Sequence, residues 1–200
     1  MRRGNHQFLP TSPYNQSVVN QRKIMATGKS QFVGTAGQFY VAFNLAVRDI
    51  NAAITLGNAP SVDLMATAHD GKRSLSFQVK TARNAYRKSR YGNEGFEWDV
   101  NKAVIGNHHP SFWYAFVNLN CGASLGEQSP EVFLVPSRWV AEFVKDGWSR
   151  LMYFLPITAK ELTHERWDLV SAYLEGKQEA IAWAMLVRCP CLPAAAPGIG

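Results

Sequence analysis

The strongest structural constraint in this sequence is a pair of alternating segments on either side of Asp70-Gly71. Apolar and polar residues alternate between residues 61 and 81 with the period of two that is typical of half-buried strands. Asp-Gly is a preferred dipeptide of two-residue type I′ hairpin turns, and a turn there places residues whose numbers sum to 141 opposite one another. The pairs on one face are then all apolar: Val62 with Val79, Leu64 with Phe77, and Ala66 with Leu75. Because a shift of one residue destroys this match, the sequence predicts both the hairpin and its register.

The other face of the predicted hairpin carries a carboxylate, an amide and an ammonium group. Asp63 opposes Gln78, and Lys80 projects from the same face two residues further on. A carboxylate is a hard oxygen ligand for Mg²⁺, and a nearby lysine can orient or deprotonate a metal-bound water. In an arbitrary hairpin, the same three residues are more simply explained as a solvated Asp–Lys pair beside a polar glutamine.

A helix is predicted ahead of the hairpin. Thr35 and Gln38 fit a capping box, with Thr35 as the N-cap, and an apolar stripe continues to about Asp49. The capping box by itself explains Gln38. Small residues in the first turn would let this helix start lie close to a sheet or a phosphate.

Positive charge is concentrated in two segments of a chain whose net charge is +6. Residues 1–30 contain five bases and no acid, and residues 71–93 contain seven bases and no acid. Concentrated positive charge suits a phosphate backbone, and the second segment adjoins Lys80. We therefore expect a basic loop there to contact a DNA backbone through Arg83, Arg87, Lys88 and Arg90.

The order of helix, Asp63 and Gln78-Val79-Lys80 resembles the PD-(D/E)XK nuclease superfamily over about residues 31–140. The segment Phe77-Gln78-Val79-Lys80-Thr81 is similar to that of uncharacterised bacterial members whose third strand reads Gln-x-Lys. The resemblance implies an α/β fold with a restriction-endonuclease-like core. In that core a helix precedes three strands, a further helix and strand follow, and helices flank a mixed central sheet. It also implies that Asp63, Gln78 and Lys80 are catalytic, with Asp63 and Gln78 as metal ligands and Gln38 as a further site residue.

Two positions depart from that pattern. Gln78 stands where most active members carry an acid, and Gln38 stands where some carry a helix glutamate. Three interpretations remain open: the Gln-x-Lys site is active as it stands, Glu97 or Asp99 from the next strand enters it, or the domain binds DNA without cutting it.

The leading hypothesis for function is metal-dependent hydrolysis of DNA phosphodiesters, of restriction, repair or defence type, with Mg²⁺ or Mn²⁺ as cofactor. Two alternatives stand beside it: a catalytically degenerate DNA-binding module of the same fold, and an interaction protein that does not bind nucleic acid. Cutting both DNA strands would favour two active sites and hence a homodimer.

The chain is expected to contain a single domain at residues 31–188, preceded by a flexible basic arm at 1–30 and followed by a disordered tail at 189–200. Met25 is a candidate for the natural start. No secretory signal and no apolar run of membrane-spanning length is visible, and three cysteines fit free thiols in a reducing cytoplasm.

Further elements are predicted in the second half. Strands are expected at residues 96–100, 112–119 and 132–135, with the second as a buried core strand. Helices are expected from Ser137 as N-cap to about Val144, and at residues 167–174 and 178–186.

Overall fold

The computed structural model describes residues 13–55, 61–90, 92–106, 108–121, 129–144, 151–177 and 182. The helices in these ranges are α1 (Pro13–Ala46), α2 (Ser137–Phe143), α3 (Lys160–Thr163) and α4 (Trp167–Leu174). Short 3₁₀ turns occupy Lys102–Val104 and Ile157–Ala159. The strands are β1 (Asn51–Ile54), β2 (Leu64–Thr67), β3 (Ser74–Ala82), β4 (Tyr86–Arg90), β5 (Asn93–Asp99), β6 (Phe112–Asn118), β7 (Glu131–Pro136) and β8 (Met152–Pro156).

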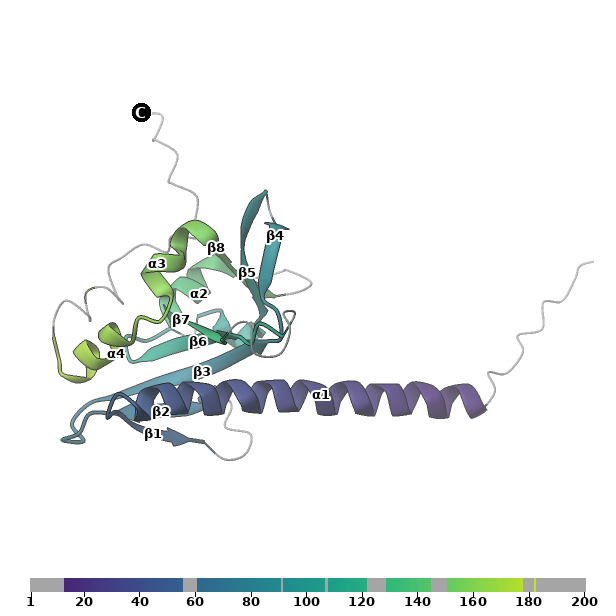
Figure 1. The fold of residues 1–200 in the computed structure, drawn as a ribbon, viewed down its shortest axis with the longest axis horizontal. Helices are drawn as coiled ribbons and strands as arrows, with labels where there is room; N and C mark the ends of the chain where they lie inside the picture. The colour runs from purple at the N-terminus through teal and green to yellow at the C-terminus, as the bar shows by residue number, and fades with distance from the viewer. Residues whose placement is uncertain are drawn as a thin grey trace, which may run out of the picture.

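The strands form two sheets. The central sheet has the order β1-β2-β3-β6-β7, in which β3 and β6 are parallel and the other neighbours antiparallel. The second sheet has the order β4-β5-β8 and is antiparallel throughout. Figure 1 shows α1 along one side of the central sheet and the second sheet with α2 on the other. The predicted α/β class, with a mixed central sheet flanked by helices, is therefore confirmed.

Each face of the central sheet has its own core. Alternate residues of β3, among them Leu75 and Phe77, pack with α1 and α4 on one face. The opposite face packs against the second sheet and α2 through aromatic side chains such as Trp98, Phe116 and Trp139. The sheet is therefore covered on both faces, which explains why the aromatic run of β6 is fully buried, as predicted.

The predicted register of the β2–β3 hairpin is confirmed, whereas the predicted type I′ turn is wrong. Leu64 faces Phe77 and Ala66 faces Leu75. The turn, however, closes with Gly71 N–H donating to Ala68 O (2.9 Å), and of Asp70-Gly71 only the glycine has a positive φ, of 70°. A type I′ turn requires positive φ at both residues. Asp70 instead accepts a hydrogen bond from Lys72 N–H (3.0 Å), which stabilises a longer loop with the same register.

The first helix begins much earlier than predicted. Thr35 lies inside α1, so it is no N-cap, and residues 13–30, expected as an arm, have helical backbone. Pro13 suits the first position of a helix, and no proline occurs between Pro13 and Pro60 to end it. Met25 falls within this helix, whereas residues 1–12 and the expected tail at 189–200 lie outside the described residues.

Four predicted elements are confirmed with small shifts: β5, β6, β7 and α4, the last at the predicted bounds. Helix α2 is confirmed, but Pro136 is its N-cap, because the Ser137 hydroxyl donates to His109 O (3.2 Å) and accepts from His109 N–H (3.0 Å). Of the predicted helix at 178–186, only residue 182 is described, and it is helical.

The connection from β3 to β6 contains neither the basic loop that we expected from the sequence nor, in its described part, the helix that the resemblance implied. The basic stretch is the strand β4 rather than a loop, and it forms an antiparallel hairpin with β5. The helix that the resemblance implied between the third strand and the next is replaced, in the described part of this connection, by β4, β5 and a 3₁₀ turn. Tyr86 stacks edge-on against Phe96, which favours the extended pairing over a loop.

Within the described residues, no helix is long and apolar enough to cross a membrane.

Candidate active site

Asp63 is held by hydrogen bonds to both of its carboxylate oxygens. It directly precedes β2, where its backbone N–H donates to Phe77 O (2.8 Å) and the regular ladder begins at Leu64. Its Oδ2 accepts from Val79 N–H (2.8 Å), and its Oδ1 accepts from Gln38 Nε2 (3.2 Å). The Asp63 carboxylate thus accepts the Val79 N–H, as a backbone carbonyl of the neighbouring strand would do in a regular ladder. The register had led us to expect Asp63 directly opposite Gln78 instead.

Gln38 reaches the site from the C-terminal third of α1. The capping-box explanation of this residue is wrong, because the helix begins at Pro13. Its neighbour Gly37 explains the reach: a Cβ atom there would lie 1.9 Å from Thr81 Oγ1, so α1 contacts β3 where only glycine fits. The sequence predicted that small residues here would let the helix approach a sheet closely. The contact occurs inside α1, however, and not at the start of a helix.

Lys80 projects from β3 into a pocket of about 410 Å³ between α1, β3, β5 and β8. Burial lowers the pKa of Lys80, and the negative charges of Asp63 and Asp99 offset part of that effect. The ammonium group is therefore held in a setting where giving up its proton is easier than in water. The pocket also contains Gly34, Glu97 and Asp99.

The two acids come from one face of β5. Glu97 and Asp99 are two residues apart, so they share a face, while Phe96 and Trp98 point into the aromatic core. Glu97 is 6% exposed, and its Oε1 lies 3.6 Å from Arg87 Nε. The geometry thus places both acids named as alternatives in the pocket beside Lys80.

Gln78 is buried on β3, next to Tyr114 of β6 in the parallel ladder. Burial raises the pKa of Tyr114, and the charge of Asp63 raises it further. The phenol is therefore protonated near Asp63. Sequence reasoning assigned Tyr114 to the core and missed this proximity, because nothing local in the sequence reports the pairing of β3 with β6. A ligand role for Gln78 stays a prediction.

The expected DNA-contacting bases lie on or beside β4. Arg83 precedes the strand and is exposed, and Lys88 is exposed on it. Arg87 turns inward, where its Nη1 donates to Asn84 O (3.0 Å) and Tyr86 O (2.8 Å) beside the contact with Glu97. Of Arg90 only the backbone is described, paired with Asn93. Figure 1 shows the β4–β5 hairpin projecting from the body above the end of β3.

The carboxylates near Lys80 could supply a small number of oxygen ligands to Mg²⁺. No group of three or more histidine, cysteine, aspartate or glutamate side chains that could hold a metal occurs among the described residues. Mg²⁺ commonly takes one or two carboxylates from the protein and completes its shell with waters and substrate phosphates. Asp63 has lone pairs beyond its two hydrogen bonds, and Asp99 lines the pocket beside Lys80, so each carboxylate is chemically suited to one such bond.

Comparison with known proteins gives one structural likeness. No family model matches the chain, and no curated protein matches it. Among solved structures, the bacterial homing endonuclease I-Ssp6803I is similar at 17% sequence identity with a TM-score of 0.49. The match covers 74% of this chain and 96% of the homing endonuclease. An identity this low carries no function from one chain to the other.

Proposed function

We propose that this chain is a metal-dependent endonuclease that hydrolyses DNA phosphodiester bonds in the pocket between α1, β3 and β5. The observation that carries the proposal is a half-buried Lys80 close to the negative charges of Asp63 and Asp99, in a polar pocket beside the basic strand β4. Buried ionisable groups with specific charge partners in a pocket are typical of catalytic sites.

Each group has a distinct role in the proposal. Asp63 and Asp99 hold Mg²⁺ or Mn²⁺, with the Gln78 amide as a neutral ligand. The ion, when bound, polarises a phosphoryl oxygen and neutralises charge that develops on it. Lys80 orients the attacking water and, in its neutral form, accepts a proton from it; the lowered pKa of Lys80 makes that neutral form more populated. Gln38 and the Val79 N–H fix the orientation of the Asp63 carboxylate.

The test is cleavage of supercoiled plasmid and of single-stranded DNA by the purified chain in Mg²⁺ or Mn²⁺, with a chelator control. Metal-dependent nicking or linearisation supports the proposal. If neither ion supports any cutting of either substrate while the protein is folded, the proposal is wrong.

A DNA-binding module without cleavage is the second candidate. Two observations favour it: a glutamine stands at position 78, and the described residues contain no group of three metal-binding side chains. This candidate predicts salt-sensitive DNA binding that divalent ions do not convert into cleavage.

Charge reversal on the hairpin is expected to weaken DNA binding. Lys88→Glu removes an exposed cation on β4 and is expected to reduce the slope of log affinity against log salt by about one. The matched control is Lys72→Glu, because Lys72 is exposed at the tip of the β2–β3 hairpin, at the other end of the molecule (Figure 1). Binding of a labelled duplex across a salt series measures both. Equal losses for the two variants would contradict a DNA path along β4.

A further inference from the structure

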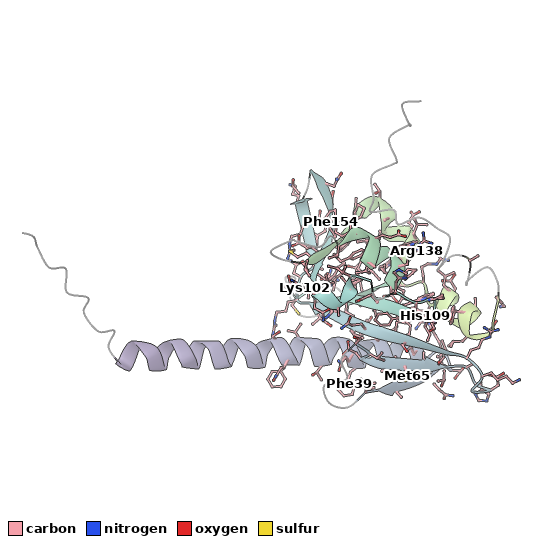
Figure 2. The ribbon with its side chains drawn as sticks, turned by 180° about the vertical axis from the view of Figure 1, so that it is seen from behind. Phe39, Met65, Lys102, His109, Arg138 and Phe154 are labelled. Atoms are coloured by element: carbon pink, nitrogen blue, oxygen red, sulfur yellow. The ribbon has the colours of Figure 1, made fainter. Side chains whose placement is uncertain are left out.

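Helix α1 carries a second apolar face that points away from the sheets. Phe32, Ala36, Phe39, Phe43 and Ala46 follow one another at spacings of four, three, four and three residues, and all five are exposed. The three phenylalanines are 75%, 62% and 60% exposed, and Val47, just beyond the helix, is 58% exposed. Phe39 is labelled beside α1 in Figure 2. We name these six residues the α1 stripe.

The fold of one chain does not need the stripe. The opposite face of α1 packs on the central sheet through Gly37, Val41 and Leu45, which are buried. A surface helix of a globular protein normally has one apolar face and one polar face. Between residues 32 and 47, α1 therefore has an apolar surface in excess of what its own core uses.

The stripe is large enough to be a contact surface. A phenylalanine buries roughly 150–250 Å² when it is covered. At these exposures, the three phenylalanines alone present about 400 Å² on each copy, and Val47 with the alanines adds to this. Two such stripes together approach the roughly 1,000 Å² that a specific interface needs. A stripe of about 400 Å² is in the range of the largest apolar patch on a typical monomer, and such patches are often functional.

We propose that the α1 stripe is the contact between two copies of this chain, with the helices antiparallel. The spacing of four and three residues averages 3.5, which is the repeat that lets two helices share one apolar seam. A stripe of this kind is complementary to itself, as a two-fold contact requires. Such a pairing would bring two of the pockets described above into one assembly.

Charge selects the antiparallel arrangement. Helix α1 contains Arg22, Lys23 and Lys29 and no acid. Parallel pairing would bring the two basic N-terminal halves of α1 together, where like charges repel. Antiparallel pairing centred on Phe39 puts the two basic halves of the helix at opposite ends of the seam.

The mass of the full chain in solution tests the proposal without involving DNA, so its outcome is separate from that of the nuclease proposal. Light scattering coupled to size exclusion, from about 1 to about 100 µM, covers the affinities of such contacts. We expect wild type to approach twice the 22.3 kDa chain mass, and Phe39→Lys/Phe43→Lys to remain at the chain mass. Leu162→Lys is the matched control, because Leu162 is an exposed apolar residue on α3 and should leave the dimer intact.

A wild type that stays monomeric throughout overturns the proposal, as does a dimer that survives the double substitution. If wild type is monomeric and hydrogen exchange shows α1 protected at the stripe, residues 178–200 of the same chain become the expected cover. If the lysine variant fails to fold by circular dichroism, Phe39→Gln/Phe43→Gln gives the same comparison with a milder change.

Discussion

Replacing Lys80 with methionine is expected to reduce DNA cleavage at least about a hundredfold while leaving the fold as stable as wild type or up to about 1 kcal/mol more stable. Activity falls because the group that orients and deprotonates the attacking water is gone. Stability does not fall, because burial is the largest influence on the pKa of Lys80 and it disfavours the ammonium form. Single-turnover cleavage and chemical denaturation measure the two effects.

The same lysine makes a pH-dependent contribution to stability. Because its pKa is lowered in the folded chain from the ordinary 10.5, the unfolded chain binds more protons between the two values. The free energy of unfolding of wild type should therefore contain a component that rises with pH in that window, and Lys80→Met should lack it. A variant that cuts DNA normally, or that unfolds more easily by several kcal/mol, would contradict the role assigned to Lys80.

Gly37→Ala is expected to lower the free energy of unfolding by about 1–3 kcal/mol and to reduce cleavage with it. The new Cβ would lie 1.9 Å from Thr81 Oγ1 and 2.9 Å from Thr81 Cβ. Rotation of the threonine relieves the first contact but not the second, so α1 must move away from β3. That movement also carries Gln38 away from Asp63, which loosens the carboxylate.

Gly34 provides the control within the same helix. A Cβ at Gly34 meets nothing within 4 Å, so Gly34→Ala should stabilise the chain by up to about 1 kcal/mol through helix propensity. The double variant Gly37→Ala/Thr81→Ala should recover part of the loss, because it removes Oγ1. Thermal unfolding of the four proteins gives the comparison. Equal stability of Gly34→Ala and Gly37→Ala would show that α1 does not pack on β3 as described.

The parts of the fold that could be predicted from sequence are those fixed by local pattern. The hairpin register follows from the alternation and the position of the turn at Asp70-Gly71, and the helix at residues 167–174 has the predicted bounds. The start of α1 was missed because Thr35 and Gln38 satisfy a capping pattern by chance, while the polar residues before them also accept helical backbone. Strand β4 was missed because its bases and polar residues resemble a loop until Phe96 and the other β5 residues pair with it.

The candidate site was predictable only where its residues share the hairpin. The register placed Asp63 and Lys80 together. The Asp63 carboxylate, however, accepts a hydrogen bond from the backbone N–H of Val79 rather than facing Gln78. The position of Tyr114 near Asp63 depends on the pairing of β6 with β3, and the acids beside Lys80 depend on the packing of β5. Both contacts join segments that are far apart in the chain. No short-range pattern encodes them.

The most direct measurement of the central claim is single-turnover cleavage of an end-labelled duplex by wild type and Asp63→Asn in Mg²⁺. Asparagine has nearly the same shape as aspartate: its oxygen can accept from Val79 N–H, and its amide can donate to Gln38 once the glutamine amide turns over. The variant should therefore fold and bind DNA like wild type, which circular dichroism and duplex binding verify. We predict that wild type cuts the duplex and that Asp63→Asn cuts at least about a hundredfold more slowly. Equal cutting by the two proteins, or no cutting by folded wild type, would contradict the account.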